Sequence, residues 1–261
     1  MQTCTKNSTE NLEHGKLQKG DIVVGIDLSA AHLAAVAITS FGVNTFCIST
    51  KKFTKLSPTN FVENVVKNKG ESSDTYAERR KHHIKRCLSA FLRTQREFIM
   101  AQKIPDSTLY VCIENYAFGS FSRAMTILAE ITGVIKQELY IADAYVRLHE
   151  PSRIKKFATD NGNATKLEMI HAAVANNFII DQRLYEQKPR IRYKKPIIDA
   201  TGPGTDLADA YWMAEMLVTE VLVRAGHILI ADLPENKREI FLSVTKQNPI
   251  NLLVRPFIHW N

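Results

Sequence analysis

Carboxylates in three well-separated segments are the residues best placed to do chemistry. Asp27 lies in the run Gly-Ile-Asp-Leu-Ser, Glu114 ends the run Leu-Tyr-Val-Cys-Ile-Glu, and Asp206 and Asp209 share the segment Asp-Leu-Ala-Asp. A carboxylate among apolar residues costs free energy unless something pairs with it. Hard divalent cations such as Mg²⁺ bind carboxylate oxygens. The sequence therefore predicts a metal site assembled from these four acids.

Each acidic segment also has an ordinary structural interpretation. Asp27 could cap a turn at the end of a strand, and acids in the first turn of a helix, such as Asp206 and Asp209, interact favourably with the helix dipole. The coincidence of three such segments favours the metal site. Two ions roughly 4 Å apart would clamp the attacking and leaving oxygens of a phosphodiester, with water as the nucleophile and no covalent enzyme intermediate.

The elements that must position these acids follow from the hydrophobic pattern. Alternating and continuous apolar runs predict five strands, and helical spacing predicts helices between and after them. The expected strands are 21–30, 34–41, 44–53, 109–114 and 144–149, and the expected helices are 76–103, 121–140, 164–178 and 206–224. Three strands followed by alternating helices and strands is the element order of a ribonuclease-H-like α/β domain, although actin-like kinases and ATPases begin in the same way.

This order predicts a single nuclease-sized domain with additions. Residues 1–19 are expected to form a flexible arm, and residues 20–225 a ribonuclease-H-like α/β domain with a mixed five-stranded sheet flanked by helices. Helical and basic insertions are expected at about 54–107 and 181–204, where 54–74 is polar and irregular and 181–204 is a basic connection. Residues 226–261 form an extension of unassigned role.

The residues just described resemble those of RuvC-like Holliday-junction resolvases, particularly larger phage-type members. Asp27 matches the aspartate of the first strand, Glu114 matches the glutamate after the fourth, and Asp206 and Asp209 match the final Asp-x-x-Asp before an Ala-rich helix. The resemblance covers roughly residues 21–53 and 108–224. It implies a Mg²⁺-dependent crossover junction endodeoxyribonuclease with two ions, in which Mn²⁺ substitutes for Mg²⁺.

The same resemblance assigns further residues. Lys155 and Lys166 are separated as the family's two functional lysines are, which implies contacts with the scissile or neighbouring phosphates and a catalytic part for Lys166. The alternative is that both are solvated lysines at helix ends. The family has an aromatic wedge shortly after the glutamate, and here Tyr116 and Phe118 are candidates either for that DNA contact or for packing.

Positive charge is concentrated in two segments. The chain has a net charge of +7, while residues 76–103 hold eight Lys or Arg against two acids and residues 183–195 hold six against one. Such concentration indicates contact with phosphate backbones, whereas a solvated face is the ordinary alternative. The candidates on the first segment are Arg79, Arg80, Lys81 and Arg86. His82 and His83 are assigned to the same charged face, because no Cys/His metal spacing accompanies them.

Composition limits the remaining classes. No run of about 18 apolar residues is present, so no membrane span is expected. The N-terminal 19 residues contain no apolar signal core, and the cysteines form no Cys-x-x-Cys pair, which favours reduced thiols and a cytoplasmic location, in the host cell if the protein is phage-encoded.

The combined interpretation is a metal-dependent, structure-specific endonuclease that resolves Holliday junctions by paired nicks. Approximate two-fold symmetry of a four-way junction calls for two active sites, and hence for a homodimer. Three alternatives stay open. The chain could cut flaps, forks or RNA-containing hybrids, it could bind DNA without cutting it, or it could be an actin-like kinase, for which it lacks a convincing Gly-rich adenosine segment.

Overall fold

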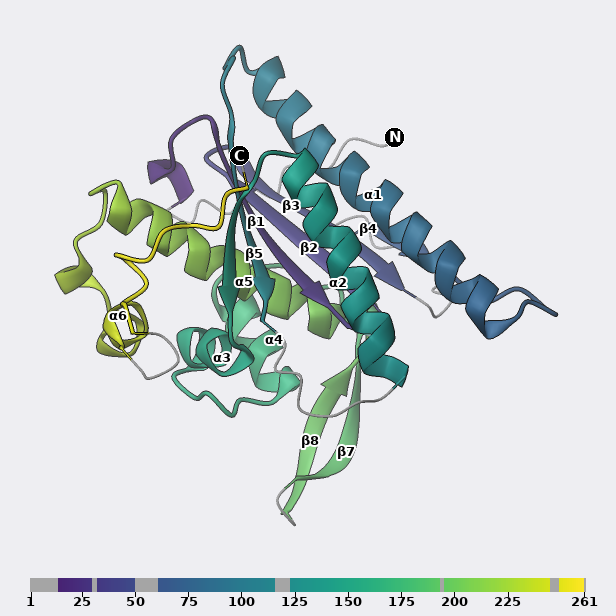
Figure 1. Cartoon of the computed structure of the whole chain (residues 1–261). Helices are drawn as coiled ribbons and strands as arrows, with labels where there is room; N and C mark the ends of the chain where they lie inside the picture. Colours follow the sequence, from purple (N-terminus) through teal and green to yellow (C-terminus); the bar gives the residue numbers. More distant parts are fainter. Residues whose placement is uncertain are drawn as a thin grey trace.

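The computed structural model describes a mixed α/β molecule (Figure 1). It contains a six-stranded sheet, a separate two-stranded sheet and helices that cover both faces of the larger sheet. The residues that the structure describes are 14–29, 32–49, 61–115, 123–192, 195–244 and 249–260.

The larger sheet has the strand order β4-β3-β2-β1-β5-β6, in which β2 runs against the other five strands. The five strands expected from the sequence are all present, in the order β3-β2-β1-β5-β6, which is the ribonuclease-H-like arrangement. The expected fold class is therefore confirmed, with β4 as an additional edge strand. The strands are β1 (Asp21–Leu28), β2 (His32–Thr39), β3 (Gly42–Ser49), β4 (Phe61–Asn64), β5 (Thr108–Glu114) and β6 (Tyr145–His149).

Three local expectations were wrong. The stretch 54–74, expected to be irregular, contains β4, whose four residues gain strand geometry only by pairing with β3. The stretch 181–204, expected to be a connection, contains the antiparallel hairpin of β7 (Glu186–Arg192) and β8 (Lys195–Thr201). A separate helix, α3 (Pro151–Thr159), begins with proline at its first turn and was not expected. In each case tertiary pairing or a short length hides the element from a periodicity argument.

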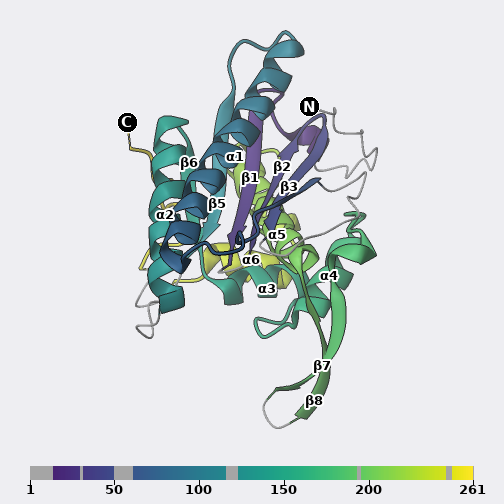
Figure 2. The ribbon, with the colours of Figure 1, turned by 90° about the vertical axis from the view of Figure 1, so that its right-hand side faces the viewer.

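Two helical layers enclose the sheet (Figures 1 and 2). One hydrophobic cluster joins one face of the sheet to α5, with α3, α4 and α6 packed around it, and the other joins the opposite face to α1 and α2. No helix of the described part of the chain is long and apolar enough to cross a membrane. The helices are α1 (Ser73–Ala101), α2 (Arg123–Ile141), α4 (Lys166–Ala175), α5 (Pro203–Arg224) and α6 (Glu235–Leu242), with the short 3₁₀ turns His14–Lys16, Gln182–Leu184 and Ile230–Asp232.

Close packing of α5 on β1 depends on Gly25. A Cβ atom added at Gly25 would lie 2.0 Å from the carbonyl oxygen of Ala210 and 2.6 Å from the backbone nitrogen of Ala214, both in α5. Only a residue without a side chain allows the helix backbone to come this close. Because side chains alternate along a strand, Asp27 projects to the same α5 face as the Gly25 position.

The segment after α5 returns to the sheet and contacts β6. Ile258 pairs with Val146 of β6 in an isolated antiparallel bridge. Arg147 of β6 donates from Nε to Glu220 of α5 at 3.1 Å, and its guanidinium also donates to the carbonyls of Arg255 and Pro256 at 2.9 Å each. This buried cation therefore links β6, α5 and the C-terminal segment.

Candidate metal centre

Asp27 lies in the next-to-last position of β1 and is 5% exposed. Its strand neighbours, Ile26 and Leu28, point to the α1 and α2 face and are buried there. The alternation of the strand turns Asp27 alone towards α5, where an ionised carboxylate lacks water. The cation beside it among the described residues is Lys166 of α4, whose charge lowers the pKa of Asp27 without offsetting the effect of burial.

The start of α5 brings the next two carboxylates. Pro203 occupies the first turn of α5, where its missing N–H costs no helical hydrogen bond. Asp206 and Asp209 follow on one side of the helix, three residues apart. Asp206 is 2% exposed, while the Asp209 side chain keeps 18% exposure. The expected Asp-x-x-Asp pair therefore faces the sheet rather than solvent.

Asp27, Asp206 and Asp209 form one carboxylate cluster, in which one oxygen of each lies within 4.8 Å of the others. Burial, followed by the charges of Asp206, Asp209 and Glu114, raises the pKa of Asp27 well above its usual range. Burial likewise raises the pKa of Asp209 to about 6, although Lys166 opposes the rise. The cluster is thus short of positive charge.

A divalent cation fits this cluster. The three side chains offer only carboxylate oxygens, the donor type that Mg²⁺ prefers. Oδ2 of Asp206 is buried and has no hydrogen-bond partner among the described residues. A buried, unpartnered carboxylate oxygen costs free energy, and a bound cation would remove that cost.

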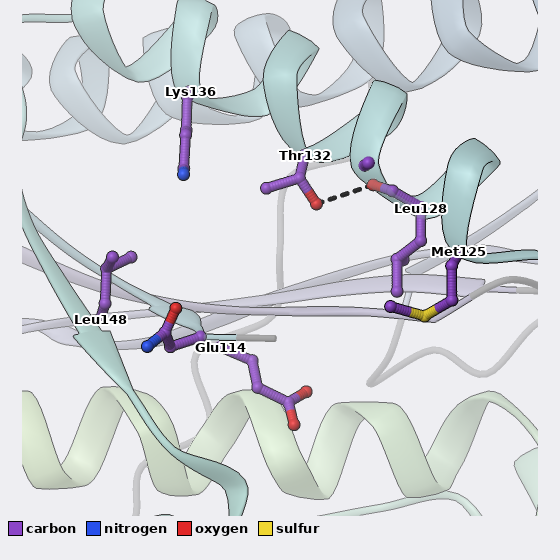
Figure 3. Close-up of a pocket in the computed structure, with 8 residues that line it drawn as sticks. Glu114, Met125, Leu128, Thr132, Lys136 and Leu148 are labelled. Atoms are coloured by element: carbon purple, nitrogen blue, oxygen red, sulfur yellow. Dashed lines mark hydrogen bonds between the residues drawn. The ribbon is translucent and has the colours of Figure 1, made fainter. Parts of the chain in front are cut away.

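Glu114 ends β5, the strand that runs parallel to β1 with Ile113 opposite Ile26. It stands outside the close group of three, yet its charge is near enough to raise the pKa of Asp27. Figure 3 shows its carboxylate on the side away from Thr132 and Lys136 of α2. Glu114 also borders a pocket between the sheet and α2, lined further by Asn115, Met125, Leu128, Ala129, Thr132, Lys136 and Leu148.

Lys166 is the first residue of α4 and reaches into the carboxylate cluster. Its Nζ lies 2.9 Å from Asp206 Oδ1, 3.6 Å from Asp209 Oδ2 and 3.2 Å from Thr205 Oγ1. Although burial lowers the pKa of Lys166, the neighbouring carboxylates outweigh it and raise the pKa above its usual range. Its ammonium is therefore charged at neutral pH, and the side chain keeps 39% exposure on the solvent side.

Local sequence fixes the position of Lys166. Thr165 caps α4 by accepting from the backbone N–H of Glu168, and the Glu168 carboxylate accepts from the backbone N–H of Thr165, which completes a capping box. Asp199 of β8 accepts from the backbone N–H of Leu167 at 3.3 Å. The helix start that carries Lys166 is thus joined to the base of the β7–β8 hairpin.

Lys155 lies on α3, half-buried, and its charge lowers the pKa of Asp209. The structure thus brings Lys155 into the electrostatic neighbourhood of the cluster, at the side of α5. Both lysines expected from the resemblance therefore belong to the surroundings of the acids. Their phosphate contacts remain predictions, because the structure contains no DNA.

The expected basic residues of α1 differ in their environments. Arg80 is 5% exposed and donates from Nη2 to the backbone oxygen of Ser29 at 3.3 Å, beside the end of β1. Arg79 pairs with Glu71, and Lys81 pairs with Glu78 and Glu130. Arg86 is exposed. Arg80 therefore supports the end of β1, and its expected DNA contact has little surface available.

Several features of the site have only a weak signal in the sequence. Thr205 holds Lys166 and also donates to the carbonyl of Gly202 at 2.8 Å, and only its position beside Asp206 hints at this role. The hairpin β7–β8 projects away from the sheet, beyond the start of α5 (Figures 1 and 2). Tyr116 and Phe118, the two expected aromatic contacts, lie outside the described residues.

Comparison with known proteins gives structural likeness alone. No family model matches this chain, and no curated protein matches it. Among solved structures it is similar to RuvC of T. thermophilus in complex with a Holliday junction substrate, with 14% sequence identity, a TM-score of 0.47, and coverage of 78% of this chain and 96% of that chain. A second Thermus thermophilus RuvC structure has 18% identity, a TM-score of 0.42 and the same coverages.

Proposed function

We propose that this chain is a metal-dependent endonuclease that cuts branched DNA, of the RuvC-like, phage-type resolvase kind expected from the sequence. The observation that carries the proposal is the cluster of Asp27, Asp206 and Asp209, in which Oδ2 of Asp206 is buried and has no hydrogen-bond partner among the described residues. Residues 20–225 would form the nuclease domain, with 226–261 as an extension, and the protein would act in the cytoplasm.

The residues have distinct proposed roles. Asp27, Asp206, Asp209 and Glu114 would hold Mg²⁺ or Mn²⁺, most simply as two ions. When bound, these ions would supply Lewis-acid stabilisation of the charge that develops on the phosphodiester. Lys166, whose Nζ lies 2.9 Å from Asp206 Oδ1 and whose side chain is 39% exposed, would hold Asp206 in place and offer its ammonium to a phosphate oxygen of the substrate.

Backbone contacts would orient the junction around this centre. Lys155, Arg79, Lys81 and Arg86 stay the proposed phosphate contacts, with Tyr116 and Phe118 as proposed base or sugar contacts. The β7–β8 hairpin joins this set, because it is anchored at the start of α4 and exposes Lys188 and Arg190. Such contacts fix orientation without reading sequence.

The test is cleavage of a labelled synthetic four-way junction, compared with matched duplex, flap and Y-fork, in Mg²⁺ and in EDTA. We expect paired, near-symmetric nicks at the junction that require the metal. Cutting confined to flaps, forks or RNA-containing hybrids would keep the nuclease and reject the resolvase. Tight junction binding without cutting of any substrate would reject the enzyme and leave a DNA-binding scaffold.

Paired nicks also require two active sites, so the proposal includes a homodimer. Light scattering of the full chain, alone and with one equivalent of junction, measures this directly. A mass of two chains per junction supports the dimer. A single chain in both conditions contradicts it.

A further inference from the structure

A second group of metal-ligating side chains lies at the edge of the sheet, away from the acidic cluster. Glu63 of β4 meets His83 and Cys87 of α1, and one donor atom of each lies within 4.8 Å of the others. His83 and Cys87 are one helical turn apart, so they share the face of α1 that is turned towards β4. Both adjacent histidines were expected on a charged face; His82 is exposed, whereas His83 is partly buried and pairs with Glu63.

The three donor atoms are already close to a coordination geometry. His83 Nε2 lies 3.0 Å from Glu63 Oε1, Cys87 Sγ lies 3.1 Å from Glu63 Oε2, and Cys87 Sγ lies 3.4 Å from His83 Nε2. Tetrahedral zinc with bonds of about 2.0–2.3 Å separates its ligand atoms by about 3.3–3.7 Å. A movement of a few tenths of an ångström would therefore admit the ion. The Glu63 side chain can make this movement, because 34% of it is exposed.

The donor set identifies the class of ion. A thiolate, an imidazole and a carboxylate together suit Zn²⁺ and exclude Mg²⁺, which takes oxygen ligands. The thiolate of Cys87 and the carboxylate of Glu63 carry two negative charges, which a divalent ion balances. Cys87 is buried, while His83 and Glu63 are partly exposed, so the fourth position faces water.

We propose that Glu63, His83 and Cys87 form a binding site for a zinc-type transition-metal ion that fastens β4 to α1. β4 is an edge strand of four residues that pairs in the sheet only with β3 among the described strands. A metal ion bound by both Glu63 and His83 would crosslink β4 to α1. Its binding free energy would therefore stabilise the pairing of this short strand. The site lies on the α1 face beside β4, whereas the acidic cluster lies on the opposite, α5 face beside β1, three strands away in the sheet.

Arg86 is the group that the ion would displace. Its Nη2 lies 3.1 Å from His83 Nδ1. Metal binding at Nε2 places the imidazole proton on Nδ1, where it would face the guanidinium. Because Arg86 is exposed, its side chain can turn into solvent.

Cobalt substitution tests this site directly on the full-length, metal-free protein in excess Mg²⁺. One equivalent of Co²⁺ should give a thiolate-to-cobalt charge-transfer band and the intense visible bands of tetrahedral Co²⁺, and Zn²⁺ should abolish both. Cys87→Ser should lose the charge-transfer band. His83→Gln and Glu63→Gln should weaken it, and His82→Gln, the exposed neighbour, should leave it unchanged. The three acids of the cluster offer only oxygen donors, but the buried thiol of Cys47 lies on the same face of the sheet, where burial and then the charges of Asp206 and Asp27 raise its pKa. Loss of the band in Cys87→Ser therefore assigns it to the Glu63 group and not to Cys47.

The result that overturns the site is equally specific. Folded wild-type protein, as judged by circular dichroism, that shows no thiolate band at one equivalent of Co²⁺ would contradict the proposal. A band of full strength in Cys87→Ser would contradict it as well. Thermal unfolding gives a second readout. Zn²⁺ should raise the Tm of wild type and His82→Gln but not of folded Cys87→Ser, and an equal rise in all three contradicts the proposal.

Discussion

At the scale of single residues, burial and neighbouring negative charges destabilise the ionised forms of the acids. Asp27 is enclosed by apolar strand neighbours and faces Asp206 and Asp209, and burial together with these charges raises its pKa. A raised carboxyl pKa means that ionising Asp27 costs folding free energy at neutral pH. A protein keeps such a residue where another function compensates for the cost, and the proposed cation binding is such a function.

Asp27→Asn tests whether Asp27 binds a cation and whether its charge lowers the stability of the metal-free protein. The variant should lose more than about 100-fold in cleavage rate, because a ligand carboxylate is gone, while junction binding in EDTA or Ca²⁺ persists. In EDTA its Tm should exceed that of wild type, because repulsion among the acids is relieved. The measurements are single-turnover cleavage, a binding titration and thermal unfolding.

Glu114→Gln provides the comparison within the site, and Glu97→Gln on α1, whose side chain is 63% exposed, is the matched control outside it. Glu114→Gln should also abolish cleavage, with a smaller change in Tm than Asp27→Asn, because Glu114 stands outside the close group. Glu97→Gln should change neither. Wild-type turnover by Asp27→Asn would remove that residue from the proposed site.

His149 gives a pH prediction. It is 1% exposed, neither ring nitrogen has a hydrogen-bond partner among the described residues, and burial, followed by the charges of Arg147, Arg153 and Arg255, lowers its pKa from 6.5 to about 3. Below pH 6.5 the unfolded chain therefore binds a proton that the folded chain does not. Stability must fall as the pH falls, by about 2 kcal/mol from this group at pH 5.

The measurement is urea unfolding of wild type and His149→Leu between pH 7.5 and 5. The free energy of unfolding of wild type relative to the variant should fall by about 2 kcal/mol over that range. Parallel pH profiles for the two proteins would show that His149 can take up its proton in the folded state.

At the scale of elements, the pairing of β1 with α5 brings three of the proposed ligands together. Gly25 lets the backbone of α5 approach β1, and Asp27 lies two residues further along the same strand face. Asp206 and Asp209 lie on the part of α5 that precedes Ala210, the residue in contact with Gly25. The distance between the two elements therefore sets the distance between the carboxylates.

Gly25→Ala should disturb both fold and site. The new methyl group would lie 2.0 Å from the carbonyl oxygen of Ala210, so α5 must shift, at a cost of about 3 kcal/mol. A shift near 1 Å between reacting groups costs about 100-fold in rate. Denaturant unfolding measures the first effect, and single-turnover cleavage at a temperature where the variant stays folded measures the second.

Gly133→Ala is the matched control, because a Cβ at Gly133 in α2 meets nothing within 4 Å. Alanine is the better helix former, so this variant should gain up to about 1 kcal/mol and cleave as wild type does. Equal stability of Gly25→Ala and wild type would show that the contact between β1 and α5 is not tight.

The sequence predicted the elements that carry strong local patterns. All five strands of the ribonuclease-H-like core and the long helix of α1 have continuous apolar runs or clear helical spacing, so local residues decide them. The close approach of Asp27, Asp206 and Asp209 follows from that topology. The predicted DNA contacts remain untested.

What escaped the sequence depends on long-range pairing. β4 is four residues long and exists because the edge of β3 accepts it. Without β4, nothing in the sequence places Glu63 next to His83 and Cys87, so the second metal-ligand group could not be inferred. The hairpin β7–β8 escaped for a different reason. Its strands are seven residues long, but their charged residues and Pro189 are typical of a loop.

At the scale of the whole molecule, the net charge of +7 is distributed unequally. Arg79 and Lys81 on α1 pair with carboxylates, and so do Lys188 and Arg190 of the hairpin. The hairpin differs in its position, because it is a projection that ends five residues before Asp206 and is anchored beside Lys166. DNA bound at the acidic cluster would lie near the base of this projection, because the start of α4 contacts both. We therefore expect the hairpin to contribute strongly to the salt dependence of junction binding.

Neutralising Lys188 and Arg190 together, each to Gln, tests this expectation. Loss of two phosphate contacts should reduce the slope of log affinity against log salt by about 2 and weaken binding about tenfold at moderate salt. Arg93→Gln is the control, because Arg93 is 68% exposed on α1 and is not among the proposed contacts. Its slope should equal that of wild type. A double variant with the wild-type slope would place the hairpin outside the DNA interface. The salt dependence would then have to come from α1, and Arg79→Gln, Lys81→Gln and Arg86→Gln should reduce the slope instead.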